Sequence, residues 1–121
     1  MPIVDVTLVA HGAEEVPAGL AQSLADAIAG VYCAPPGEVW VRLQVLPATH
    51  YAENGTPVDE QPMPVFVRVL TAEAAAGARA AQAQALAAAV ATACARMPQR
   101  VHVLFEPAAT GRIAFGGVLL Q

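Results

Sequence analysis

The feature that most constrains the fold of this chain is an internal repeat, seen when residue n is laid over residue n + 62. Residues 1–4 (Met-Pro-Ile-Val) then fall on residues 63–66 (Met-Pro-Val-Phe). Residues 39–41 (Val-Trp-Val) likewise fall on residues 101–103 (Val-His-Val). Identities are few, so the comparison depends on the shared register of apolar positions. Two half-chains of about sixty residues are therefore expected to fold alike.

The two halves, 1–62 and 63–121, are expected to form a single domain, because 121 residues suffice for one ordinary domain and not for two. Each half has the pattern of a strand, a helix and a second strand. The strands are rich in β-branched residues, and the helices carry apolar residues at helical spacing or strong helix formers. The expected elements are residues 3–9, 16–31 and 39–46 in the first half and residues 64–71, 74–97 and 100–105 in the second.

A strand-helix-strand connection makes its two strands parallel, with a right-handed crossover. Two such units side by side predict an α+β fold, in which one four-stranded sheet carries two helices on one face. The other face is expected to be apolar as well, because apolar residues occupy both parities of the strands and no further helix remains to cover it. Self-association would cover this face.

Two segments lie outside these elements. The loop 47–64 contains the turn signal Asn54-Gly55 and suits a hairpin or a lid over a site. The glycine-rich tail 111–117 is expected to make a second hairpin.

The residue types that are missing exclude several kinds of chemistry. All 6 basic residues are arginines, so a lysine Schiff base and a P-loop are excluded. Ser23, the only serine, lies in an expected helix without the turn that a hydrolase nucleophile needs. The histidines and cysteines lack the spacing of metal ligands. A net charge of −4 with scattered arginines predicts no nucleic-acid or membrane-surface partner, and no apolar run is long enough to span a membrane.

Cys33 and Cys94 are far apart in the sequence, and both fall in expected helical patterns. We expect reduced core thiols rather than a disulfide. The beginning of the chain lacks the basic residues that open a signal peptide. Together these features predict a cytoplasmic protein.

Several of these features together resemble the tautomerase superfamily, which includes 4-oxalocrotonate tautomerase and macrophage migration inhibitory factor. The resemblance covers essentially the whole chain. It rests on Pro2 at the start of the first strand, on the pair Ala27-Ile28, and on residues 101–107 (Val-His-Val-Leu-Phe-Glu-Pro) and 113–117 (Ile-Ala-Phe-Gly-Gly). Members with two β-α-β units form trimers, so the resemblance implies a homotrimer. It also implies an enzyme without a metal or organic cofactor.

The resemblance implies that Pro2 is a catalytic general acid and base for enol-keto proton transfer on a small 2-oxo acid, with its amine exposed after removal of Met1. Physical chemistry supports this role. An α-amino group has an ordinary pKa of about 7.7–8.0, which burial or a nearby arginine lowers toward neutrality. If Met1 is retained, the Pro2 nitrogen is an amide without basicity. Tyr51, in the loop 47–64, is expected either to hydrogen-bond the developing oxyanion or to pack on the sheet as an ordinary loop aromatic.

Family members bind the substrate carboxylate through arginines, and these are missing here. Their positions are at the end of the first strand of each half and on the strand that follows each helix. In this chain those positions hold His11 and Gly12, Ala72 and Glu73, and Trp40 and His102.

Arg68 is the first substitute, because an arginine within an apolar strand must find an anion. That anion is either a substrate carboxylate or an ion-pair partner, Asp5 or a glutamate at a subunit interface. Arg42 and Arg112 are further candidates for the carboxylate, Arg112 by reaching a neighbouring subunit. Pocket-lining roles are expected for Trp40, Phe115 and His102, the last being alternatively an interface histidine. The remaining arginines, expected to be solvated, are Arg79, Arg96 and Arg100.

Two other interpretations remain open. The missing arginines also fit a catalytically silent binding or structural module with the same fold, in which Pro2→Ala would have no effect. Alternatively, the chain is a ferredoxin-like β-α-β-β-α-β domain that resembles the tautomerase superfamily only in composition. Such a domain would form a monomer or dimer.

Overall fold

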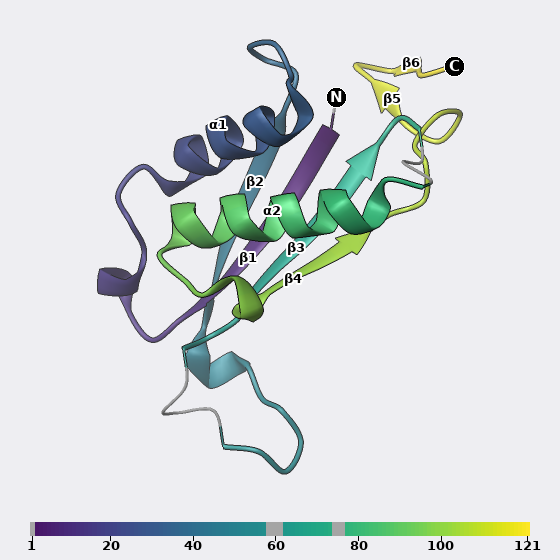
Figure 1. The fold of residues 1–121 in the computed structure, drawn as a ribbon. Helices are drawn as coiled ribbons and strands as arrows, with labels where there is room; N and C mark the ends of the chain where they lie inside the picture. Colours follow the sequence, from purple (N-terminus) through teal and green to yellow (C-terminus); the bar gives the residue numbers. More distant parts are fainter. Residues whose placement is uncertain (1, 58–61, 74–76) are drawn as a thin grey trace.

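The computed structural model describes residues 2–57, 62–73 and 77–121. Four strands form one sheet, and two helices lie across one of its faces (Figure 1). The strands of the sheet are β1 (Pro2–Ala10), β2 (Trp40–Pro47), β3 (Val65–Thr71) and β4 (Val101–Phe105), the helices are α1 (Leu20–Tyr32) and α2 (Arg79–Cys94), and a terminal hairpin consists of β5 (Ala114–Phe115) and β6 (Val118–Leu119). Short 3-10 turns occur at Ala13–Glu15, Ala48–His50 and Pro98–Arg100.

The strand order is β2-β1-β3-β4. β1 is parallel to β2, with Ile3 opposite Trp40, and β3 is parallel to β4, with Val65 opposite Val101. The two halves meet where β1 and β3 pair antiparallel. The predicted fold class is therefore confirmed. A ferredoxin-like domain is excluded because its β-α-β units are split by another strand, whereas here the two strands of each unit pair directly.

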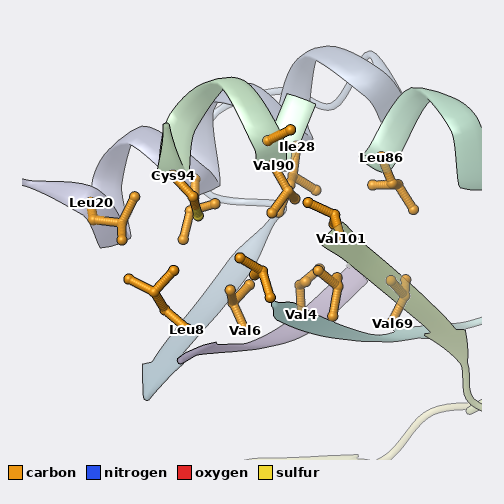
Figure 2. Packing of buried hydrophobic residues seen from close by; sticks show 14 residues of the cluster. Val4, Val6, Leu8, Leu20, Ile28, Val69, Leu86, Val90, Cys94 and Val101 are labelled. Atoms are coloured by element: carbon orange, nitrogen blue, oxygen red, sulfur yellow. The ribbon is translucent and has the colours of Figure 1, made fainter. Parts of the chain in front are cut away.

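The core lies between the sheet and the two helices. Alternate residues of the central strands point toward the helices, among them Val4, Val6 and Leu8 of β1 (Figure 2). From the helices, Ile28 of α1 and Leu86 of α2 meet them, and all five side chains are at most 1% exposed. Burial of this apolar surface is the main favourable term in folding.

Both helices are shorter than predicted. α1 begins at Leu20 and not at residue 16, because Gly19 adopts a left-handed backbone conformation with φ 67°. α2 ends at Cys94, where Ala95 is left-handed and the backbone N–H of Arg96 donates to the carbonyl of Ala91 at 2.9 Å. This bond is typical of a Schellman-type helix end. Residues 74–76 of the predicted second helix lie outside the described residues.

The structure corrects the prediction of two core thiols. Cys94 is buried in the core, but Cys33 is exposed at the left-handed residue that ends α1. Both cysteines are free.

The predicted hairpins are found in part. β5 and β6 pair antiparallel around Gly116 and Gly117, whose positive φ values of 57° and 89° suit a tight hairpin turn. In the loop after β2, Glu53 and Thr56 form a bridge around the Asn54-Gly55 turn. Residues 58–61 of that loop lie outside the described residues.

The face of the sheet away from the helices is only partly apolar, contrary to the prediction. Phe66 and Leu104 are exposed there, but charged residues cross it where the register places Asp5 opposite Arg42 on one side and Arg68 on the other. We call this side the open face. Among the described residues, no helix is both long and apolar enough to cross a membrane.

Candidate functional site

Pro2 opens β1, and its side chain is buried. Its partner on β3 is Thr71, the last residue of that strand. The chain beyond β4 fixes this strand end, because the N–H of Ala109 donates to the carbonyl of Thr71 and the hydroxyl of Thr110 donates to the carbonyl of Ala72, both at 2.9 Å. Pro2 therefore lies at the end of a central strand, beside a strand end that the chain after β4 holds in place.

A cavity of about 350 Å³ lies on the open face at the same end of the sheet. It begins one residue from Pro2 at Ile3, and one residue from Thr71 at Leu70. Its walls are aliphatic and charged, and they consist of Ile3, Leu70, Ile113, Arg42, Arg68, Arg112, Asp5 and Glu106. The structure thus brings together the three arginines that the sequence proposes for substrate binding. We call this space the arginine cavity.

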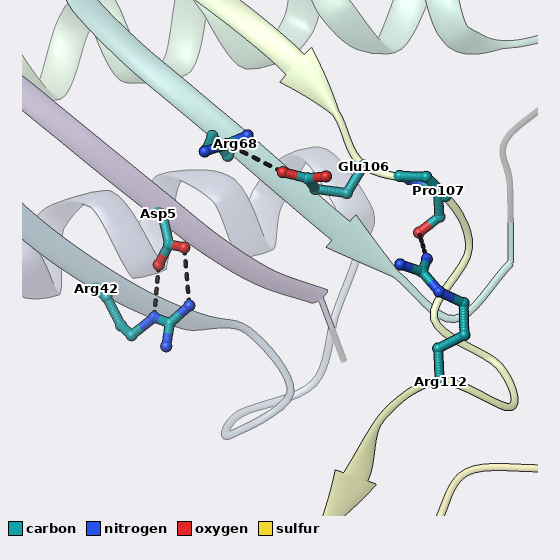
Figure 3. A network of polar contacts seen from close by, with 6 residues as sticks. All are labelled: Asp5, Arg42, Arg68, Glu106, Pro107 and Arg112. Atoms are coloured by element: carbon teal, nitrogen blue, oxygen red, sulfur yellow. Dashed lines mark hydrogen bonds and ion pairs between the residues drawn. The ribbon is translucent and has the colours of Figure 1, made fainter.

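Two of these arginines are held by carboxylates (Figure 3). Arg42 donates from Nε and Nη2 to the two carboxylate oxygens of Asp5, at 2.5 and 2.8 Å. These hydrogen bonds and the charge of Asp5 raise the pKa of Arg42. Arg68 donates from Nε to Oε1 of Glu106 at 2.9 Å. Within the chain, the ion-pair partner of Arg68 is therefore Glu106, and not the expected Asp5 or a glutamate at a subunit interface.

Arg112 differs from the other two arginines. Its Nη1 donates to the carbonyl oxygens of Pro107 and Ala108, at 3.2 and 3.1 Å. Among the residues that the structure describes, no carboxylate lies within ion-pair distance of Arg112. No carboxylate of the described residues therefore compensates the positive charge of Arg112 at the cavity wall.

Trp40 and Phe115 lie at the end of the sheet where Pro2 opens β1, and their rings contact each other. Their ring centroids are 5.4 Å apart in an edge-to-face arrangement, and the Trp40 indole N–H donates to the carbonyl of Gly37 at 2.9 Å. Both line a separate hollow of about 250 Å³ together with Gly37 and Glu38. The two predicted wall residues are thus neighbours, and 52% of Trp40 remains exposed.

Tyr51 lies at the other end of the sheet. β2 starts opposite Ile3 and ends opposite Ala10, and the segment after β2 extends beyond that end in Figure 1, away from the amino terminus. The strand length of β1 places the two ends more than about 20 Å apart. Within one chain, therefore, the structure does not bring Tyr51 to Pro2.

The surroundings of Tyr51 are those of a packed loop residue. Its hydroxyl donates to Glu53 at 2.6 Å, and its ring lies 5.9 Å from that of Phe66. The hydrogen bond to Glu53, followed by burial and the charge of Glu53, raises the pKa of Tyr51. His102 lies toward the same end, with its ring 5.5 Å from Phe66. It lines a groove on the open face and not the arginine cavity.

The expectation that the remaining arginines are solvated is wrong for two of them. The side chain of Arg96 is only 8% exposed and donates to the carbonyl of Met63 at 2.5 Å. Arg100 is 20% exposed and donates to the carbonyl of Pro62 at 2.8 Å. Both hold the chain segment that leads into β3. Arg79 lies with its guanidinium 5.5 Å from the ring centre of Phe105, a cation-π contact.

The sequence interpretation missed the site roles of Glu106 and Ile113 and gave Asp5 only as a possible partner of Arg68. A signal for Asp5 was available, because a carboxylate in an apolar strand needs a partner for the same reason as Arg68. Ile113 reaches the cavity through the terminal segment, which no strand pattern could place. Among the described residues, no group of three or more His, Cys, Asp or Glu side chains could hold a metal ion.

No protein-family model matches the sequence, and no curated protein matches it. Solved structures do match the fold. A structure of native fused 4-OT has a TM-score of 0.75 and 24% identity, over 97% of this chain and 94% of the other. A fused 4-OT symmetric trimer has a TM-score of 0.72 and 22% identity, over 97% and 94%.

A macrophage migration inhibitory factor from Oncomelania hupensis has a TM-score of 0.73 and 18% identity, over 98% of this chain and 81% of the other. These likenesses extend over nearly the whole chain and include both β-α-β units. The chain therefore has the fold of the tautomerase superfamily, in the form with two β-α-β units.

Proposed function

We propose that this protein is a tautomerase-like enzyme that uses the amine of Pro2 as general acid and base for enol-keto proton transfer on a small 2-oxo acid. One observation carries the proposal: the arginine cavity begins at Ile3, next to Pro2, and Arg42, Arg68 and Arg112 all line it. A carboxylate bound there would place the adjoining carbonyl carbon near the end of β1. Hydrogen bonds between guanidinium and carboxylate are among the strongest in proteins.

The proposed reaction needs only proton transfers. The free Pro2 amine removes a proton from the carbon next to the substrate carbonyl, and the carbonyl oxygen takes up the electron pair as an enolate. The Pro2 ammonium then returns the proton to this oxygen, which gives the enol, and the reverse sequence gives the ketone. No metal or organic cofactor takes part in this scheme.

The enolate oxygen needs a hydrogen-bond donor. Tyr51 of the same chain lies at the wrong end of the sheet, so Tyr51 could act only from a neighbouring subunit. Otherwise a backbone N–H would serve. We propose a homotrimer like that of the fused 4-OT neighbour, formed through exposed apolar side chains on the open face and the terminal hairpin. These side chains are Phe66, Leu104, Val118 and Leu119.

The other predictions fit this proposal and remain predictions. They are a single domain over residues 1–121 and a cytoplasmic location without nucleic-acid or membrane partners. In the proposed assembly His102 is an interface residue, while Trp40 and Phe115 wall the space beside Pro2.

A catalytically silent module remains the second candidate, and one observation favours it. The two strand positions at which relatives are expected to carry arginines hold Trp40 and His102, and no arginine is among the described residues that line the hollow at Trp40.

The test is the rate at which the protein removes the enol of a 2-oxo acid, followed by enol absorbance. We expect Pro2→Ala to lower kcat by about 100-fold or more and Arg68→Ala to raise KM. Gln22→Ala, an exposed change on α1, serves as the control with unchanged rate. If the wild-type protein binds the 2-oxo acid but does not convert it, the proposed enzymatic activity is wrong and the silent module is supported. Full activity of Pro2→Ala would overturn the proline mechanism.

A further inference from the structure

The charges of the arginine cavity do not cancel. Three guanidinium groups line it, and they face two carboxylates. Asp5 neutralises Arg42 through two hydrogen bonds, and Glu106 neutralises Arg68 through one. Arg112 donates only to backbone carbonyls. The formal charge of the cavity is therefore +1, and it is concentrated at Arg112.

We propose that the arginine cavity selects substrates with one carboxylate over those with two, and that Asp5 and Glu106 determine this selectivity. This inference rests on the proposed function and names the substrate class of the same site. The single carboxylate binds at Arg112 and reaches the guanidinium groups of Arg68 and Arg42 at their free N–H groups. Arg68 uses only its Nε toward Glu106, so its terminal nitrogens remain able to donate.

A second carboxylate on the substrate has no uncompensated cation to meet. It would come close to Asp5 or Glu106, and like charges at short range in a partly enclosed space disfavour binding. Water screens this repulsion in part, because the Arg42–Asp5 side chains are 73% and 41% exposed and the Arg68–Glu106 side chains 60% and 34%. The expected discrimination is therefore on the order of tenfold, and not the much larger factor of a fully buried site.

The rest of the cavity wall fits an apolar substrate chain. Ile3, Leu70 and Ile113 provide three aliphatic side chains from β1, β3 and the segment before β5. A volume of about 350 Å³ lies at the small end of the range of about 300–1,000 Å³ that small-molecule sites span. The site thus suits a short aliphatic 2-oxo acid, whose tail lies against these side chains while its carboxylate faces Arg112.

The experiment compares two probes of equal chain length, 2-oxopentanoate and 2-oxoglutarate, by calorimetric titration. Wild-type protein is expected to bind 2-oxopentanoate about tenfold more tightly. Asp5→Asn and Glu106→Gln each remove one negative charge with little change of shape, and each is expected to reduce this ratio by roughly tenfold. Asp26→Asn, an exposed carboxylate change on α1, is the matched control and should leave the ratio unchanged. Thermal melts establish that each variant is folded.

Three results would overturn the inference. Wild-type protein could bind 2-oxoglutarate as tightly as 2-oxopentanoate, it could bind neither probe, or both cavity variants could leave the ratio unchanged. Measuring both selectivity and turnover on the wild-type protein separates this inference from the proposed function, and the same titration on Pro2→Ala measures selectivity without the proposed base. Selective binding by a wild-type protein that shows no turnover would contradict the enzyme alone, whereas turnover without selectivity would contradict the charge argument alone.

Discussion

Arg42 and Asp5 form a two-point ion pair across the parallel strands β1 and β2, with N–O distances of 2.5 and 2.8 Å. The register places their Cα atoms directly opposite each other. Because Arg68 lies opposite Asp5 on the other side, one carboxylate lies between two arginines in the middle of the open face. Arg68 forms its ion pair with Glu106 instead of Asp5. This arrangement turns a face expected to be apolar into the charged floor of a cavity.

The ion pair itself is expected to add little stability. The side chains of Arg42 and Asp5 are 73% and 41% exposed, and solvent-exposed pairs contribute about 0.2–1 kcal/mol. A double-mutant cycle with Arg42→Ala and Asp5→Asn in urea unfolding should give a coupling free energy in this range. The coupling should fall at 1 M salt, where the Debye length is about 3 Å. A coupling of several kcal/mol would mean that the pair is buried in the assembled protein.

Core substitutions should have much larger effects. Leu86 of α2 is 0% exposed and packs between the helix and the sheet. Leu86→Ala should lower the free energy of unfolding by about 2–5 kcal/mol, because it removes buried methyl groups and leaves a cavity. Met97→Ala, at a side chain that is 53% exposed, is the control and should change it by less than about 1 kcal/mol. Equal effects of the two changes would contradict the described core.

Arg96 should matter more for stability than its place after α2 suggests. Its side chain is 8% exposed, donates to the carbonyl of Met63 and lies 3.9 Å from Glu15. Arg96→Ala leaves that buried carbonyl without its donor and should destabilise the fold by about 1–3 kcal/mol. Arg79→Ala, which loses only an exposed contact with Phe105, should have the smaller effect in the same thermal melts. The opposite ranking would show that the segment before β3 is held by other contacts.

Stability should fall in alkaline solution because of Cys94. Burial raises the pKa of this thiol to about 11, although the charge of Arg96 lowers it in part. In the unfolded chain the thiol ionises near its ordinary pKa of about 8.5. Above that pH the unfolded state gains the thiolate while the folded state does not, so stability decreases until pH reaches about 11. Cys94→Ala should show a shallower loss of melting temperature over this range, and parallel curves would contradict this effect.

The two thiols should also differ in reactivity. Cys33 is exposed, whereas Cys94 is buried with a raised pKa, and only the thiolate reacts with a disulfide reagent. At pH 8 the folded protein should react at one thiol per chain, and a second should react only after unfolding. Cys33→Ser should abolish the reaction of the folded protein. Two reactive thiols in the folded protein would place Cys94 at the surface.

Much of the fold follows from local patterns in the sequence. The repeat predicted two β-α-β units, and the β-branched runs predicted the four strands, because both signals lie within short segments. The helix ends were less predictable. Ala95 takes a left-handed conformation that alanine rarely adopts, and the shortened start of α1 depends on the backbone of Gly19.

The site was predictable only in part, because it depends on register. The apolar setting of Arg68 indicated an anion, but its pairing with Glu106 depends on the path of the chain after β4. The position of Tyr51 relative to Pro2 was unpredictable for a similar reason, although the structure bears out its expected alternative as a loop aromatic packed on the sheet. Because β2 runs parallel to β1, the loop that follows β2 begins at the end of the sheet away from Pro2. Sequence spacing alone does not give that direction until the pairing of strands is known.

The proposed mechanism requires that Pro2 presents a free, nucleophilic amine beside the arginine cavity, which begins at Ile3. Its most direct test is the intact mass of untagged protein before and after incubation with an ynoic acid, followed by peptide mapping. We expect a mass without Met1 and, after incubation, one adduct on the amino-terminal peptide. In this adduct the Pro2 nitrogen has bonded to the alkyne carbon and its proton has moved to the neighbouring carbon. Cys33→Ser should give the same adduct. A mass that includes Met1, or labelling confined to Cys33, would rule out Pro2 as the catalytic base.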